Sequence, residues 1–238
     1  MRFYCIKIPK QKILTMLSLT AFLISLLSIP YFASEDMENV DLSVLAGHNI
    51  ILDPGHGGID SGATANNVIE KEITMKISIK LAETLRKYGA IVALTREEDI
   101  DYYTKGKGGK RKDLLKRIEM IEQSGAEFFV SIHCNAFPTG NLSGAQVFYS
   151  PKFPESKLLA ERLQQALKAF PKGNKRQVKE DLRILLLNGI KMPGVLIETG
   201  YLTNQQEAFL LNDAAYQQAL AEQIAKGLAY HFHQYVVK

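Results

Sequence analysis

The sequence is poor in cysteine, and most of it has no excess of positive charge. Of its 238 residues only Cys5 and Cys134 are cysteines. The N-terminal segment would place these two on opposite sides of a membrane, so we expect no intrachain disulfide. The net charge of +4 comes entirely from residues 1–12, because residues 35–238 contain 25 basic and 25 acidic residues. A nucleic-acid-binding protein keeps a basic excess in its folded part, so we expect no nucleic-acid partner.

Two common nucleotide-binding motifs are also missing. The glycine-rich stretch LDPGHGGIDSG (52–62) does not fit G-x-G-x-x-G, because Asp60 stands where the third glycine is needed after Gly55 and Gly57. The motif G-x-x-x-x-G-K-[ST] does not occur, and there is no internal repeat or low-complexity tract. Hydrophobic residues make up 46% of the chain and charged residues 23%, which is typical of a globular protein.

The N-terminus differs from the rest of the chain. Basic residues precede an uncharged run of 21 residues from Ile13 to Ala33, which is long enough to span a membrane. A small-x-small cleavage site is poor here, because Tyr31 lies two residues before Ala33. We expect residues 1–34 to be a signal peptide or membrane anchor, with the basic flank in the cytoplasm and the rest outside.

After an acidic linker, 35–47, strands and helices alternate through a single domain, 48–238. The apolar patterns predict strands at 49–53, 91–95, 127–132, 145–149, 183–187 and 194–198, and helices at about 70–88, 112–124, 155–170 and 213–235. This alternation predicts an α/β fold, with a mostly parallel twisted sheet of about six strands and helices on both faces.

Chemically active residues follow several of the predicted strands. His56 lies just beyond the first strand, and Arg96 follows the second. His133 and Asn135 follow the strand EFFVSI, and Glu198 ends the strand GVLIE. Because ligands bind at the carboxyl ends of the strands in an open α/β sheet, we expect these side chains to gather at one edge.

Two histidines and one carboxylate are a common ligand set for catalytic zinc, which keeps a further position open for water. His56 and His133 supply the imidazoles, and the glycines around His56 allow the sharp turn that would aim its ring. From the residues alone, either Glu70, at the start of the first helix, or Glu198 could be the third ligand.

Six sequence pieces carry a family resemblance. They are LDPGHGGIDSGA, IEKEIT, LTREED, FVSIHCNA, SGAQVFY and PGVLIETGYLTN, and they occur in this order between residues 49 and 235. The chain resembles the zinc-dependent N-acetylmuramoyl-L-alanine amidases of bacterial cell walls, the amidase-3 type. The resemblance implies that His56, Glu70 and His133 bind Zn²⁺ and that Glu198 is the catalytic acid–base.

The resemblance also implies the reaction, which is hydrolysis of the amide between N-acetylmuramic acid and L-alanine in peptidoglycan. Arg96 and Asn135 would position substrate or support the site. The chain has no wall-binding repeat, and its segment KGKGGKRKDLLKR (105–117) resembles that of germination-specific amidases, which remove peptide from spore cortex on the route to muramic-δ-lactam. We interpret 105–117 as a solvated basic loop entering a helix rather than as a binding surface for an anionic polymer.

Two other functions are compatible with an exported protein that has a zinc site. One is a membrane-tethered pseudoenzyme that binds peptidoglycan, and the other is a zinc peptidase acting on wall peptides. The presence of all four site residues disfavours the first, and the order of the motifs disfavours the second. We therefore expect the protein to bind peptidoglycan and, through its N-terminal segment, the membrane, and a helper protein is a further candidate partner. We expect it to act at the cell wall or in the forespore intermembrane space.

The predicted topology can be tested with a reporter fused after residue 40. Because the basic residues precede the apolar run and the segment after it is acidic, we expect activity from an extracytoplasmic reporter such as alkaline phosphatase. A reporter that works only in the cytoplasm should be inactive at the same position, and the opposite pattern would reverse the topology.

Overall fold

The structure is a computed structural model that describes residues 16, 18, 20, 37–102 and 109–236. The chain divides into two compact units, Met1–Asn39 and Val40–Lys238, and the fold described below is that of the second. The expected signal segment, Ile13 to Ala33, lies outside the described residues except at three positions. Among the described residues, no helix has both the length and the apolar character needed to cross a membrane.

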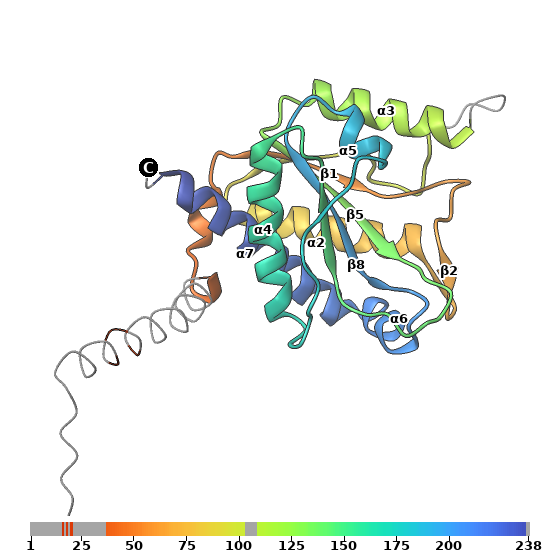
Figure 1. The fold of residues 1–238 in the computed structure, drawn as a ribbon. Coiled ribbons are helices and arrows are strands. Elements are labelled where there is room, and N and C mark those ends of the chain that lie inside the picture. Colours follow the sequence, from red (N-terminus) through yellow and green to blue (C-terminus); the bar gives the residue numbers. More distant parts are fainter. Residues whose placement is uncertain (1–15, 17, 19, 21–36, 103–108, 237–238) are drawn as a thin grey trace, which may run out of the picture. The chain divides into compact units, whose positions relative to one another are not determined.

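A six-stranded sheet forms the centre of the second unit (Figure 1). Its order is β4 (Ile91–Leu94), β1 (Asn49–Pro54), β5 (Phe128–Asn135), β8 (Gly194–Tyr201), β6 (Gln146–Tyr149) and β7 (Lys179–Glu180). Neighbouring strands are parallel except for β6 and β8, which are antiparallel. The prediction of a mostly parallel α/β sheet is therefore confirmed.

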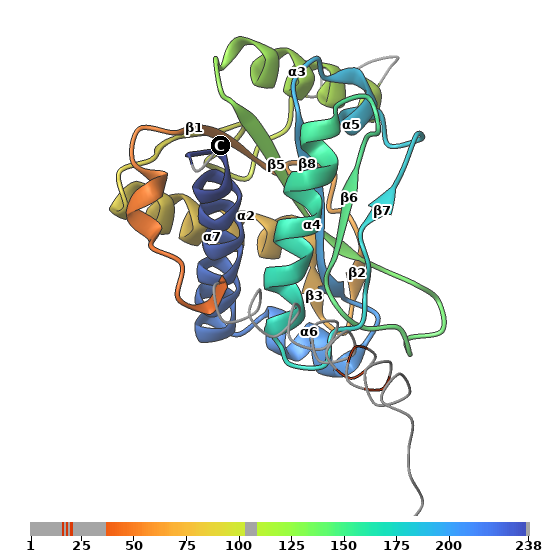
Figure 2. The same cartoon turned by 60° about the vertical axis from the view of Figure 1, so that its left-hand side comes forward.

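Helices cover both faces of the sheet (Figures 1 and 2). One face carries α2 (Glu70–Lys87), α4 (Pro154–Ala169) and α7 (Ala214–Val236), and the other carries α3 (Gly109–Gln123) and the short α5 (Leu185–Gly189). Helix α6 (Gln205–Leu211) follows β8 directly, and the hairpin of β2 (Thr64–Ala65) and β3 (Val68–Ile69) precedes α2.

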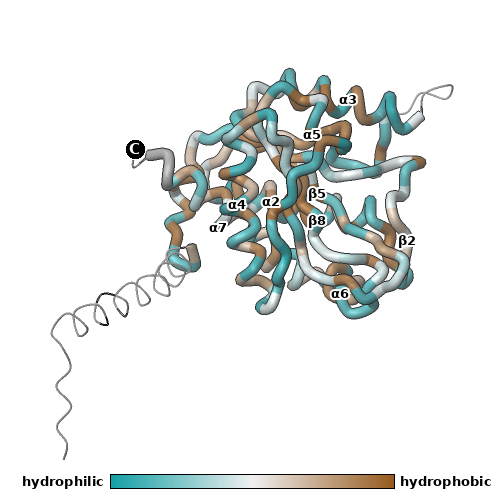
Figure 3. The backbone as a smooth tube through the Cα atoms, viewed as in Figure 1, coloured by the Kyte–Doolittle hydropathy of each residue, from teal (hydrophilic) through white to brown (hydrophobic). Residues whose placement is uncertain are grey.

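The strands alternate between two apolar clusters, as a period of two requires. In β5, Phe128, Val130 and Ile132 join the larger cluster with α2, α4 and α7, whereas Phe129 joins the smaller one with α3 and α5. Figure 3 shows hydrophobic stretches of the chain, in brown, among the central strands. The alternation decides which strand residues share a face with the candidate site.

Helix α2 matches its predicted limits and sets the position of one site residue. Its buried stripe includes Ile73, Ile77, Leu81 and Leu85. Glu70 is the first residue of the helix, where the partial positive charge of the N-terminus stabilises a carboxylate.

The predicted strand at 183–187 is wrong, because this segment enters helix α5. Asp181 Oδ1 accepts hydrogen bonds from the main-chain N–H groups of Arg183 and Ile184 at 2.7 and 3.1 Å. The Asn188 side chain donates to the carbonyls of Asp181 and Ile184. A short apolar run fits a buried strand or a buried helical turn equally well, and these polar side chains stabilise the helical form.

Smaller differences concern elements that the periodicity did not reveal. The β2–β3 hairpin and α6 were not predicted, and α3 begins at Gly109 rather than near residue 112. Within the expected linker, Leu42–Leu45 forms a 3-10 helix, η1, whose Leu45 is buried in the larger cluster. Segments this short have too few residues to show a helical or strand period.

Candidate metal centre

The site begins with a strained turn at the end of β1. After Pro54 the chain bends so that His56 adopts a φ of 61°, a conformation that non-glycine residues rarely occupy. The main-chain N–H groups of Gly58 and Ile59 bind the carboxylates of Asp99 and Asp101. The turn is therefore held from the neighbouring 98–101 segment, and it directs the imidazole of His56 over the sheet edge.

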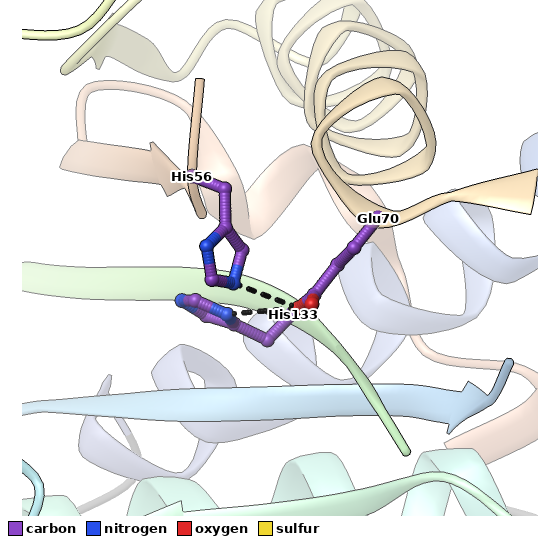
Figure 4. A group of neighbouring side chains, drawn as sticks. All are labelled: His56, Glu70 and His133. Atoms are coloured by element: carbon purple, nitrogen blue, oxygen red, sulfur yellow. Dashed lines mark hydrogen bonds and ion pairs between the residues drawn. The ribbon is translucent and has the colours of Figure 1, made fainter. Parts of the chain in front are cut away.

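Three side chains from distant parts of the sequence meet at this edge (Figure 4). Glu70 Oε1 lies 3.1 Å from His56 Nε2 and 3.1 Å from His133 Nδ1. The two imidazole rings meet edge to face, with centroids 4.9 Å apart. One donor atom from each residue lies within 4.8 Å of the other two, so the three side chains offer two nitrogens and one oxygen to a single ion.

Glu70 is fixed in its place by backbone donors. Its Oε2 accepts from Ala63 N at 2.8 Å, and its Oε1 accepts from Cys134 N at 2.9 Å. Burial would raise the pKa of Glu70, but the hydrogen bonds and charges of His133 and His56 hold it well below its usual value. The carboxylate is therefore ionised across the physiological range, as a metal ligand must be.

A carboxylate also orients His56 from behind. Asp60 Oδ2 lies 2.8 Å from His56 Nδ1, which fixes Nε2 toward Glu70, and Lys110 Nζ lies 2.6 Å from Asp60 Oδ1. A carboxylate bonded to the outer nitrogen of a histidine is a recurrent support of metal sites. The sequence reasoning missed Asp60, although its spacing of four residues from His56 in HGGID was a usable signal.

Glu198 stands beside the cluster rather than in it. In the pairing of β5 with β8 it lies opposite His133, and paired residues of parallel strands face the same side. Its Oε2 is buried and has no hydrogen-bond partner among the described residues. Burial raises the pKa of Glu198 to about 7, with a further contribution from Glu70. Of the two glutamates that the residues left open, only Glu70 reaches both histidines.

Gly55 leaves space for His133. A Cβ atom at Gly55 would lie 2.3 Å from His133 Cε1, so any larger residue would push the imidazole away from Glu70. Gly55 N also donates to Ile132 O at 2.9 Å, which keeps the turn close to β5. The glycine-rich sequence thus serves close packing of two histidines as well as chain reversal.

Arg96 lies under the turn, not in the open site. It is buried, and its guanidinium donates to the carbonyls of Pro54, Gly55 and Lys71 at 2.9 Å each. Burial and the nearby Arg117 lower the pKa of Arg96 to about 10, which leaves it charged at neutral pH. Of the two roles expected for Arg96, this geometry fits support of the site rather than contact with substrate.

Arg117 forms a second brace that the sequence reasoning missed. It is fully buried on α3, and its Nη1 donates to Asp53 Oδ1 at 2.9 Å and to Pro54 O at 2.8 Å, while Nη2 donates to His56 O. Asp113, one turn earlier, binds Arg117 Nε at 2.8 Å. Interpreting 105–117 as a solvated loop is therefore wrong for Arg117, although residues 103–108 lie outside the described part.

Asp53 connects this brace to two strands. It is buried at the end of β1 and accepts hydrogen bonds from Thr95 Oγ1 at 2.6 Å and Ser131 Oγ at 2.7 Å. Burial would raise the pKa of Asp53, but Arg117 and these hydroxyls hold it below its usual value.

Asn135, the remaining predicted residue, ends β5 opposite Tyr201, near the three-residue cluster but outside it.

The fold and the site together describe an α/β protein with a group of side chains that could hold a metal ion, and comparison with known proteins identifies its family. Residues 50–230 match the family of N-acetylmuramoyl-L-alanine amidases. The chain therefore belongs to this family, and it is an enzyme that hydrolyses the muramoyl–L-alanine amide of peptidoglycan.

One relative by sequence and two solved structures show the extent of the match. The germination-specific N-acetylmuramoyl-L-alanine amidase of Bacillus subtilis (strain 168) is 36% identical over 228 residues, which cover 94% of this chain and 96% of that protein. The solved CwlD amidase from Clostridioides difficile, in complex with the GerS lipoprotein, is 39% identical with a TM-score of 0.75, covering 79% of this chain and 100% of that one. An N-acetylmuramoyl-L-alanine amidase from Clostridium difficile 630 is 31% identical with a TM-score of 0.69, covering 78% and 97%.

Replacing Arg117 by alanine should destabilise the protein strongly. Its removal leaves Asp53 buried with an unbalanced charge, which costs about 3–5 kcal/mol of unfolding free energy. Urea denaturation of the purified protein measures this loss. The matched control is Lys116→Ala, because Lys116 pairs with Glu119 at 3.0 Å on the exposed side of the same helix and should change stability by less than about 1 kcal/mol. Equal effects of the two substitutions would contradict the proposed brace.

Proposed function

We propose that this amidase binds one Zn²⁺ through His56, Glu70 and His133 and uses Glu198 as its proton shuttle. The observation that carries the proposal is the position of Glu70 Oε1, 3.1 Å from a nitrogen of each histidine. Two imidazoles and one carboxylate are a ligand set of catalytic zinc. The support of His56 by Asp60 fits the same assignment.

The arrangement of polar side chains at the site suits a bound metal ion. Three buried or half-buried polar side chains converge on one small volume, and the neighbouring Glu198 Oε2 is a buried acceptor without a partner among the described residues. Buried acceptors are rarely left unpaired. When bound there, zinc would polarise the amide carbonyl and lower the pKa of a water molecule.

Glu198 has the properties of a general base that later acts as an acid. Its pKa of about 7 is close to neutral pH, where a carboxylate can accept a proton and return it. We propose that Glu198 takes the proton of the attacking water and delivers it to the nitrogen of the leaving L-alanine. Its position opposite His133 in the strand pairing supports this role.

Arg96 and Asn135 are proposed to act in different ways. Arg96 would support the site, because its guanidinium donates hydrogen bonds to the carbonyls of Pro54 and Gly55 in the turn before His56. Asn135 would contact substrate, because it ends β5 two residues after His133. Neither residue would be a metal ligand.

The biological setting is proposed from the relatives. The Bacillus subtilis relative is a germination-specific amidase, so we propose that this chain removes peptide from spore cortex on the route to muramic-δ-lactam. Residues 1–34 would export or anchor it, residues 35–47 would join this segment to the catalytic part, 48–238, and the enzyme would act outside the cytoplasm. The C. difficile amidase was solved with a lipoprotein, and a helper of this kind is proposed here too.

Replacing His133 by alanine should abolish most zinc binding. The substitution removes one of three proposed ligands, so elemental analysis should find about one zinc per wild-type chain and far less in the variant. His233→Ala is the control, because His233 is exposed near the end of α7 and should leave zinc content unchanged. Full zinc occupancy of His133→Ala would show that the ligand set is wrong.

Replacing Glu198 by glutamine should preserve zinc and reduce amide cleavage by about 10²–10⁴-fold, because the side chain keeps its size but loses its basicity. Wild type and variant are incubated with zinc and either spore or vegetative peptidoglycan, and mass spectrometry identifies the released ends.

The released ends also separate the alternative functions. Free muramoyl carboxyls and N-terminal L-alanine indicate the amidase, cleavage within the peptide indicates a wall peptidase, and no cleavage indicates a pseudoenzyme. Loss of zinc from Glu198→Gln would move Glu198 into the ligand set, and a normal rate would contradict the mechanism.

A further inference from the structure

A basic groove lies beside the candidate metal centre and contains none of its residues. Its volume is about 780 Å³, within the size range of ligand pockets. Three walls form it: the β5–β6 loop with Gly144, the segment 171–176 after α4, and the start of α6 with Glu207. In Figures 1 and 2 the end of α4 that leads into this segment lies beside α6.

The strand pairing places the groove close to Glu198. In the antiparallel pair of β6 and β8, Gln146 lies opposite Glu198, and Gly144 precedes Gln146 by two residues. The groove therefore begins two residues along the chain from the residue that is paired with Glu198.

The groove carries an excess of positive charge, because three basic side chains and one carboxylate, that of Glu207, line it. Lys172, Lys175 and Arg176 line it, and none of the three forms an ion pair with a carboxylate of the described residues. Glu207 is the acidic lining residue, but its two oxygens accept hydrogen bonds from the main-chain N–H groups of Gly144 and Tyr201 at 2.8 Å each. The groove therefore favours an anionic ligand.

Arg176 is held in position before any ligand binds. Its Nε donates to Ser143 O at 2.9 Å, its guanidinium lies 4.9 Å from the ring centre of Tyr201, and its main-chain N–H binds Asn174 Oδ1. Tyr201 follows Glu198 by three residues on β8. A planar guanidinium that is already oriented suits recognition of a carboxylate.

We propose that this groove binds carboxylate groups of the peptide that the enzyme removes, on the L-alanine side of the scissile amide. The inference rests on the proposed function. Glycan strands of N-acetylated sugars are neutral here, because the one acidic group of N-acetylmuramic acid is its lactyl carboxyl, which is part of the amide being cleaved. The anion that matches Lys172, Lys175 and Arg176 must therefore lie on the peptide.

The experiment compares two substrates that differ only in their peptide carboxyls, free in one and amidated in the other. Full-length wild-type enzyme should have a higher kcat/KM for the free acid, and salt should reduce this preference. In Lys172→Gln/Lys175→Gln the preference should fall about 3- to 30-fold, as expected for exposed charge pairs. The change should appear in KM rather than kcat, because the groove binds a part of the substrate remote from the reacting bond.

Three further variants separate charge from structure. Arg176→Lys keeps the charge and should retain part of the preference, whereas Arg176→Gln should lose about tenfold or more, because a charged hydrogen bond is lost. Lys157→Gln/Lys191→Gln is the matched control, since both lysines are exposed and Lys191 precedes the opposite end of β8. This control should behave as wild type.

A binding measurement distinguishes failure of the groove assignment from failure of the proposed function. Calorimetry with Glu198→Gln and the free-acid or amidated peptide substrate gives a Kd without cleavage. If wild type fails to cleave but the acidic peptide binds more weakly after Lys172→Gln/Lys175→Gln, the proposed function fails and the groove assignment stands. If that double substitution leaves the acidic-peptide Kd unchanged, the inference is overturned, including the case in which the groove binds an acidic protein instead.

Discussion

A buried charge pair underlies both the fold and the candidate site. Asp53, at the end of β1, accepts from Arg117 on α3, and the same guanidinium binds the carbonyls of Pro54 and His56. Taking both charges out of water is costly, so such a pair persists where it also satisfies other buried groups. Here it satisfies carbonyls of a turn in which His56 has a positive φ. With Arg96 beneath the same turn, the network holds one imidazole in a position that the chain would otherwise avoid.

The sheet itself accounts for the position of the other site residues. On the face shared with α3 and α5, β5 presents Phe129, then Ser131, then His133, and β8 presents Leu196 and then Glu198. The first of these residues pack in the smaller apolar cluster, Ser131 binds Asp53, and the last form the site. The surface thus changes from apolar to polar to reactive along a few residues. This gradient follows from strand alternation.

Much of this arrangement could be predicted from the sequence, and the failures have physical reasons. Helix α2 was predicted closely because its apolar stripe repeats over several turns, and the predicted strands at 49–53, 127–132 and 194–198 correspond to β1, β5 and β8. The segment 183–187 was assigned to a strand because five residues cannot distinguish a buried strand from a helical turn, and the hydrogen bonds of Asp181 and Asn188 decided for the helix. The β2–β3 hairpin was missed because its two-residue strands have no period to detect.

The sequence by itself determined the class of fold, the order of the motifs and the candidate residues His56, His133 and Glu198, because strand ends and strand alternation are local properties. Only the tertiary structure decided which glutamate meets both histidines. Glu70 does so because α2 begins beside β5 and Cys134 N holds its carboxylate. The buried role of Arg117 and the basic groove beside Glu198 were also decided there. Each depends on contacts between residues far apart in sequence, and local patterns of charge and hydrophobicity do not specify such contacts.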